Sequence, residues 1–151
     1  MLLSQTGKYA LRATIHLAEQ GSDQPIPVGE IAAALDVPRN YLSKILHQLA
    51  REGVLISERG PRGGFRLATS PDDLSVAQVV SIVDPALLER KCLLGRQQCS
   101  DVDPCPAHGT WQDLAQRIEQ FLSETTLSDL MRQPGEVLLE LPRASAAVRR
   151  R

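Results

Sequence analysis

Residues 29–51 constrain the fold of this chain most, because they carry the pattern of two short helices joined by a tight turn. Residues 29–36 and 39–51 have helical spacing of apolar side chains, and Val37-Pro38 separates them. Asp36 stands at the turn, where its side chain tolerates left-handed backbone better than most others. The pattern predicts a helix-turn-helix, a motif that presents its second helix to the major groove of DNA.

The side of the second helix opposite its apolar stripe carries the side chains expected to contact DNA. Arg39 suits guanine, Asn40 suits adenine, and Ser43 suits several base edges. Lys44 suits phosphate. An ordinary solvated surface is the alternative for each residue, and for His47 the two interpretations weigh equally. The expected contacts on this helix are Arg39, Asn40, Tyr41, Ser43, Lys44 and His47.

Two short apolar runs flank a Gly/Pro-rich turn in residues 54–67, which is a β-hairpin pattern. A hairpin beside such a helix is the wing of a winged helix. Its glycines permit close approach to the DNA backbone, and Arg62 at its tip suits the electronegative minor groove. A nucleotide-binding phosphate loop is disfavoured, because the lysine and following helix of that motif are missing. The expected wing contacts are Arg59, Gly60, Pro61, Arg62 and Gly63.

The charge distribution agrees with a polyanion-binding face on one part of the chain. The net charge is −1, yet residues 38–66 carry six basic and two acidic side chains, whereas residues 72–142 carry five basic and twelve acidic ones. An apolar content of 42% is enough for a core. No stretch has membrane-spanning length, so we expect a soluble, cytoplasmic protein without a membrane partner or small-molecule substrate.

All three cysteines fall within residues 92–108. Six residues separate Cys92 from Cys99, five separate Cys99 from Cys105, and His108 follows shortly after. Glycines and prolines predict a loop, which can gather these side chains around one centre. Three thiolates and an imidazole suit zinc or an iron–sulfur cluster better than calcium or magnesium. A catalytic zinc enzyme is disfavoured, because four protein ligands leave no open coordination position.

Three interpretations of this loop stay open: an iron–sulfur cluster, a structural zinc and a cysteine redox switch. Zinc ligands usually occur as closely spaced cysteine pairs, which this loop lacks. Cluster ligation tolerates wider spacings, and histidine replaces cysteine in Rieske centres. A redox switch would leave His108 without a role. A structural disulfide is disfavoured by the odd cysteine count.

Further helices are indicated on both sides of these motifs. Residues 4–20 and 75–83 have helical spacing, and residues 110–125 show the three-four spacing of a coiled coil. Ser75, Thr110 and Thr126 have the pattern of helix N-caps. We expect the helix after Thr110 to pair with its copy in a second subunit; packing within its own subunit is the alternative. The expected interface residues are Trp111, Leu114, Ile118, Phe121 and Leu122.

These features divide the chain into four parts and predict a mainly α fold with a small β-hairpin. Residues 1–84 form a winged helix-turn-helix DNA-binding domain with its wing at 54–67. Residues 85–109 form the cysteine-rich metal or cluster loop. Residues 110–131 form the dimerisation helix and a short terminal helix. Residues 132–151 form a tail that we expect to be disordered at its end.

The collinear set of motifs over residues 1–131 resembles the IscR/NsrR/RirA group of bacterial winged-helix transcription regulators, and within it the IscR-type iron–sulfur cluster regulators. The resemblance rests on the opening Leu-Leu-Ser-Gln-Thr-Gly-Lys-Tyr-Ala, the wing Arg-Gly-Pro-Arg-Gly-Gly-Phe, the three cysteines and Trp-x-Asp-Leu. It implies a homodimer that binds operator DNA and a 2Fe–2S cluster, with 4Fe–4S or zinc as alternatives. The ligands it implies are Cys92, Cys99, Cys105 and His108.

Three features depart from the pattern of the group. The first cysteine spacer is six residues long, against five in the usual IscR arrangement. Lys8 stands where some nitric-oxide-sensing relatives have an acidic ligand to a 4Fe–4S cluster, which argues against that variant. Ser43 and Lys44 replace acidic and amide side chains of IscR, so the resemblance does not carry over the operator sequence.

Overall fold

The computed structural model of this chain describes residues 3–21, 23–87, 92–96 and 100–132. The helices are α1 (Gln5–Gln20), α2 (Val28–Leu35), α3 (Arg39–Arg51), α4 (Val76–Val83), α5 (His108–Glu124) and α6 (Leu127–Met131). The remaining elements are the 3-10 helix η1 (Pro85–Leu87) and the strands β1 (Leu55–Glu58) and β2 (Gly64–Leu67). The chain is therefore mainly helical with one small antiparallel hairpin, which confirms the predicted fold class.

Helix α1 has well-defined ends. The side chain of Ser4 accepts a hydrogen bond from the backbone N–H of Gly7, which satisfies one of the donors exposed at a helix start. Gly21 ends the helix in the left-handed conformation, with φ of 55°. Its buried face, which includes Ala10, Ala13 and Leu17, packs in the main core together with α3.

The helix-turn-helix is present over the predicted residues. Asp36 adopts φ of 53° and is the one non-glycine residue with positive φ in the described part of the chain. Arg12 donates a hydrogen bond to the carbonyl of Leu35 at 2.7 Å, which satisfies an acceptor at the end of α2. The buried side chains of both helices share the main core: Ile31, Ala32, Leu42, Ile45, Leu46 and Leu49.

The hairpin is anchored to the segment that precedes α2. Strands β1 and β2 pair from Leu55 opposite Leu67 to Glu58 opposite Gly64. Ile26 and Phe65 form an isolated bridge, in which each backbone N–H donates to the other's carbonyl at 2.9 Å. A Cβ on Gly64 would collide with the backbone of Ile26, so only glycine permits this close approach.

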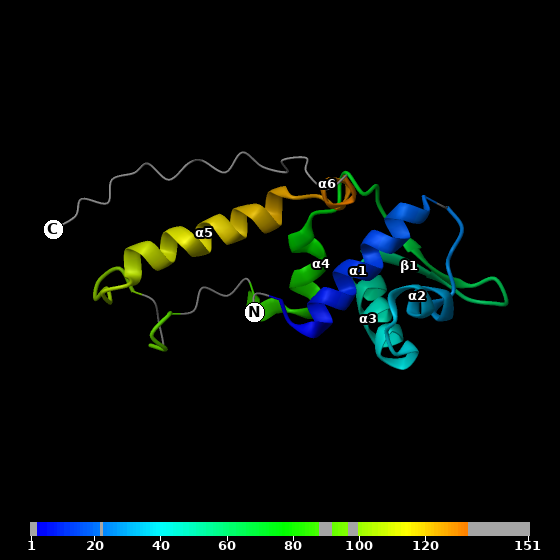
Figure 1. Ribbon diagram of the computed structural model, residues 1–151, viewed down its shortest axis with the longest axis horizontal. Coiled ribbons are helices and arrows are strands. Elements are labelled where there is room, and N and C mark those ends of the chain that lie inside the picture. The colour runs from blue at the N-terminus through cyan, green and yellow to red at the C-terminus, as the bar shows by residue number, and fades with distance from the viewer. Residues whose placement is uncertain (1–2, 22, 88–91, 97–99, 133–151) are drawn as a thin grey trace.

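Helix α5 extends away from the body formed by α1–α4, as Figure 1 shows. Leu122 is the only residue of α5 that is buried, and it lies in a second core with Val76 and Val80 of α4. A backbone bridge between Ser75 and Thr126 fixes the C-terminal end of α5, which we call the arm, to the start of α4. The two predicted capping residues at this bridge, Ser75 and Thr126, both form complete capping boxes.

The start of α5 differs from the prediction, which placed the N-cap at Thr110. The helix begins at His108, and Ala107 stands at the N-cap without a side-chain hydrogen bond. The amide of Trp111 donates to the carbonyl of Ala107 at 2.9 Å, so Thr110 already lies within the first turn of the helix. His108 therefore lies inside the first turn of the helix, and the predicted cap at Thr110 is wrong.

The predicted tail of residues 132–151 lies outside the described residues, apart from Arg132. Over the described ranges, no helix combines the length and apolar character needed to cross a membrane.

Candidate DNA-binding surface and cysteine loop

The predicted DNA-contacting face of α3 is on the surface of the protein. Arg39, Asn40, Lys44 and His47 are exposed, and Ser43 is half-buried. The opposite face of α3 is fully occupied by the main core. The side chains at the N-terminal end of α3 are therefore available to base edges, as the major-groove geometry of a helix-turn-helix requires.

Tyr41 has a structural contact that the sequence did not indicate. Its hydroxyl forms a hydrogen bond with the hydroxyl of Thr6, and its ring lies edge-on to Tyr9 with 5.8 Å between ring centroids. Tyr41 is still 40% exposed. The residue thus joins the start of α3 to the start of α1 while leaving part of its surface free for a phosphate.

His47 connects α3 to the hairpin. Its ring lies edge-on to Phe65, with 5.0 Å between centroids and an interplanar angle of 69°. Such an edge-to-face contact adds to the packing of two aromatic rings. Because Phe65 also bridges to Ile26, this contact fixes the position of the wing relative to α3.

The arginines of the hairpin fall into two kinds. Arg66 donates to a carboxylate oxygen of Glu58 at 2.9 Å and so has a partner across the strands. Arg59 and Arg62 are exposed, and neither forms an ion pair with any described residue. The positive charge that the wing offers to a polyanion therefore comes from Arg59 and Arg62. Gly60, Pro61 and Gly63 complete the predicted tip.

Glycine serves different purposes along this turn. Gly60 has φ of 111° with open space around it, so backbone conformation explains the residue. At Gly63 a Cβ would collide with the carbonyl of Glu58. The glycine at that position is therefore required by the turn itself, independently of any approach to DNA.

Two of the four predicted metal ligands come together in the cysteine loop. Cys92 and Cys105 are free thiols, 9% and 8% exposed, and their side chains lie beside one another. Backbone N–H groups of Arg96 and Leu94 donate to the sulfur of Cys92 and hold the pKa of its thiol below the usual value. Cys99 lies outside the described residues.

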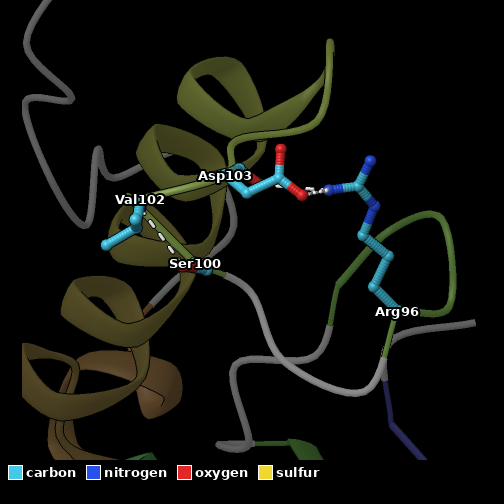
Figure 2. Close-up of polar contacts among 4 residues, drawn as sticks. All are labelled: Arg96, Ser100, Val102 and Asp103. Atoms are coloured by element: carbon cyan, nitrogen blue, oxygen red, sulfur yellow. Dashed lines mark hydrogen bonds and ion pairs between the residues drawn. The ribbon is translucent and has the colours of Figure 1, made fainter.

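An ion pair joins Arg96 to Asp103, which both lie between these two cysteines in the sequence (Figure 2). Nη1 of Arg96 donates to the backbone carbonyl of Asp103 at 3.0 Å and to its carboxylate at 3.2 Å. Asp103 stands two residues before Cys105, and the backbone N–H of Arg96 faces the sulfur of Cys92. Arg96 therefore holds both described halves of the loop together.

His108 has a carboxylate partner. Its Nε2 lies 2.7 Å from an oxygen of Asp101, and its side chain is only 12% exposed. Among the described residues, which include Cys92, Cys105 and His108 but not Cys99, no three His, Cys, Asp or Glu side chains are grouped so that they could hold a metal ion. The structure thus brings two cysteines together and holds the histidine three residues after Cys105, at the positive end of the α5 dipole.

The donor set fits a soft metal or an iron–sulfur cluster. Thiolates are the ligands that such centres require, and N–H groups directed at sulfur stabilise the thiolate form of Cys92. The carboxylate of Asp101 on the imidazole of His108 resembles the outer partners that orient metal-binding histidines.

The predicted interface residues of α5 divide by burial. Leu114 is 48% exposed, and Trp111, Ile118 and Phe121 are half-buried. Leu122 is 2% exposed and packs against Val76 and Val80 within the same subunit, so it has almost no surface left for a partner. The apolar surface that α5 offers outward is therefore centred on Leu114.

The model of the Rrf2 family, described as iron-dependent transcriptional regulators, matches residues 3–133. The chain is 34% identical to the HTH-type transcriptional regulator IscR of Pectobacterium carotovorum, over 99% of this chain and 90% of that protein. It is 35% identical to IscR of Vibrio atlanticus, over 91% and 79% of the two chains.

Two solved structures share the fold of this chain. CymR, the global cysteine regulator of B. subtilis, superposes with a TM-score of 0.72 at 22% identity, covering 85% of this chain and 95% of that one. T. potens IscR superposes with a TM-score of 0.68 at 24% identity, covering 85% of both chains.

Proposed function

Because this chain belongs to the Rrf2 family of transcriptional regulators, we propose that it is a homodimer whose affinity for operator DNA is set by an iron–sulfur cluster. DNA-binding transcriptional regulation is the function of the family, and the chain is a regulator rather than an enzyme. The observation that carries the proposal is the convergence of Cys92 and Cys105, with N–H groups directed at the Cys92 sulfur, in a protein with a winged helix.

Base recognition is assigned to the N-terminal half of α3. Arg39 and Asn40 are exposed there and suit guanine and adenine edges in the major groove. Arg62 at the wing tip suits the adjacent minor groove. In a two-fold dimer the two α3 helices would meet half-sites about one turn apart, roughly 34 Å in B-DNA.

The cluster would be held by the three cysteines and His108. The described residues support this assignment through the burial of Cys92 and Cys105 and the Asp101 partner of His108. A 2Fe–2S cluster is the form proposed, because Lys8 is a cation where the 4Fe–4S variant uses an acidic ligand. When bound, such a cluster supplies a centre that can be oxidised, reduced or lost.

A change in the cysteine-rich loop would be transmitted through α5 to the two winged-helix domains of the dimer, which we call the heads. The loop lies between α4, which packs in the body, and α5, which offers Leu114 to a second subunit. Ordering of the loop would bias the spacing of the two heads. The expected coupling is on the order of 1–3 kcal/mol, the usual scale for two linked sites.

The cluster is tested by purifying the full chain without oxygen and measuring its visible spectrum, iron, sulfide and zinc. The proposal expects a coloured protein with matched iron and sulfide, and a loss of colour in Cys92→Ala. Asp113→Ala, which changes an exposed carboxylate on α5, is the control and should stay coloured. A colourless protein with one zinc per chain would contradict the cluster and identify the site as a structural zinc.

A cysteine redox switch is the second candidate, favoured by the proximity of the Cys92 and Cys105 thiols. It predicts a metal-free protein in which an oxidant such as oxidised glutathione converts the two thiols to a disulfide and is itself reduced to two thiols. Operator affinity would then change with oxidation in the wild type and stay constant in Cys105→Ser.

Base and backbone contacts are separated by two variants. Arg62→Ala should weaken binding to every DNA sequence, whereas Arg39→Ala should relax the preference between operator and mutated operators. Binding should weaken steeply as salt rises, because phosphate contacts release counterions. A wild-type affinity that stays constant between 50 and roughly 200 mM salt would contradict the assigned surface.

A further inference from the structure

A groove lies between α3 and the first strand of the wing, next to the face expected to contact bases. It has a volume of about 910 Å³ and opens to solvent. Its basic side chains, Lys44 and Arg51, come from α3, and Leu55 and Ile56 of β1 form an apolar wall beside the hydroxyl of Ser57. Neither Arg51 nor Ser57 belongs to the DNA contacts expected from sequence.

The basic residues of the groove lie on one face of α3. Lys44, His47 and Arg51 are spaced by three and four residues, which places them along one side of a helix. With a rise of 1.5 Å per residue, Lys44 and Arg51 are separated by roughly 10 Å along the helix axis. This separation is enough for the two charges to contact different phosphates of one DNA strand.

The charge in this groove is not neutralised by the described residues. Lys44 and Arg51 are exposed and form no ion pair within the described part of the chain, and none of the side chains described as lining the groove is a carboxylate. Arg66, Arg96 and Arg132, by contrast, each have an aspartate or glutamate partner. Because Lys44 and Arg51 have no such partner among the described residues, their charges are available to an anion from outside the chain.

Two contacts hold the walls of the groove in place. Gln48, in its lining, donates to the backbone carbonyl of Ile82 at 2.7 Å and so joins α3 to the end of α4. His47 packs edge-on against Phe65 of β2. The distance between helix and hairpin is therefore fixed before any ligand binds, which reduces the ordering cost of binding.

We propose that this groove binds the sugar–phosphate backbone of duplex DNA, with Arg51 and Ser57 as phosphate contacts between the base-reading end of α3 and the wing tip. The proposal rests on the proposed DNA-binding surface and adds a path for one strand across it. A DNA strand fits better than a small anion, because the residues of α3 that line the groove, and the charges among them, extend over two helical turns.

Arg51 also stands in the last turn of α3, where a cation interacts favourably with the helix dipole. That role would change the thermal stability of the protein without changing how salt affects DNA binding. The salt dependence of binding therefore distinguishes a phosphate contact from a structural residue.

The test measures the affinity of the full-length protein for an operator fragment and for a random duplex of equal length, at several salt concentrations. Arg51→Ala should reduce the slope of log K against log salt by about 0.9 and weaken binding to both duplexes equally, roughly fivefold at 0.15 M salt. Ser57→Ala should weaken both affinities by a smaller factor with little change in slope. Arg51→Lys, which keeps the charge, should keep the slope.

Arg117→Ala is the matched control, because it removes an exposed arginine of α5. It should leave the slope and both affinities unchanged, and melting temperatures of all variants report on folding. An Arg51→Ala slope equal to that of the wild type, together with a reduced slope in Arg62→Ala, would overturn the groove while leaving the proposed function intact. An effect of Arg51→Ala on the operator alone would also overturn it, since phosphate contacts do not discriminate sequence.

Inorganic phosphate provides a further arm. If inorganic phosphate competes with duplex DNA only weakly, and no more than its contribution to ionic strength explains, the result agrees with a DNA path. Saturable phosphate binding that requires Arg51 and is unaffected by duplex DNA would instead identify a small-anion site. If the wild type binds no duplex at all, both the groove and the proposed function fail.

Discussion

Leu114→Ala should weaken dimerisation more than any other single truncation on the outer face of α5. Complete burial of a leucine contributes about 1.5–3 kcal/mol, and Leu114 is 48% exposed in the isolated subunit. Covering that remainder contributes roughly 0.7–1.4 kcal/mol per subunit, and a two-fold interface uses the residue twice. The loss of about 1.5–3 kcal/mol corresponds to a roughly tenfold to hundredfold higher dimer Kd.

Sedimentation velocity over a range of protein concentrations measures this Kd directly. Gln116→Ala is the control, because Gln116 is an exposed polar residue of the same helix and lies about 200° around its axis from Leu114. Leu114→Ala should leave the helix content unchanged, since alanine is a strong helix former. A dimer Kd of Leu114→Ala within twofold of the wild type would refute the assignment of this face.

Four further predictions rest on individual contacts. Gly64→Ala should lower the free energy of unfolding by more than about 2 kcal/mol in urea denaturation, because its methyl group would collide with the backbone of Ile26. Thr126→Ala should cost about 1 kcal/mol through loss of the α6 cap. The same capping box lowers the pKa of Asp129 below 3.8, so its contribution is complete above that pH and is lost as pH falls through the folded-state pKa. Asp129→Asn should therefore be less stable than wild type at neutral pH, with a difference that disappears in acid. In the metal-free protein, alkylation of Cys92 by iodoacetamide should have a pH midpoint below that of a free cysteine thiol in the same buffer, because nearby N–H groups stabilise its thiolate.

The helix-turn-helix and its hairpin were predictable because their determinants are local. Asp36 indicates the left-handed turn because its side chain tolerates that backbone conformation. The apolar spacing of residues 39–51 defines which side of α3 faces the core. The capping boxes at Ser75 and Thr126 follow from residues three positions apart. The start of α5 was not predictable in this way, because a main-chain hydrogen bond to Ala107 began the helix before its expected cap.

Much of the candidate site depended on contacts between distant residues. No local pattern distinguishes Arg66 from Arg62, yet the pairing of β1 with β2 brings Arg66 within ion-pair distance of Glu58 and leaves Arg62 without an ion pair to any described residue. Thr6 and Tyr41 meet only because α1 and α3 pack together, although they lie 35 positions apart in the sequence. The assembly of the four-ligand centre stays a prediction, since Cys99 lies outside the described residues.

The sequence by itself therefore determined which segments are helical, where the wing turns, and which residue types could hold a metal or contact DNA. Only the tertiary structure decided that Leu122 faces its own core while Leu114 faces outward, that Cys92 meets Cys105, and that a cationic groove lies beside α3. The physical reason is the distance along the sequence over which each interaction acts. Backbone propensity and capping act over a few residues, whereas burial and charge pairing depend on neighbours that only the packed chain supplies.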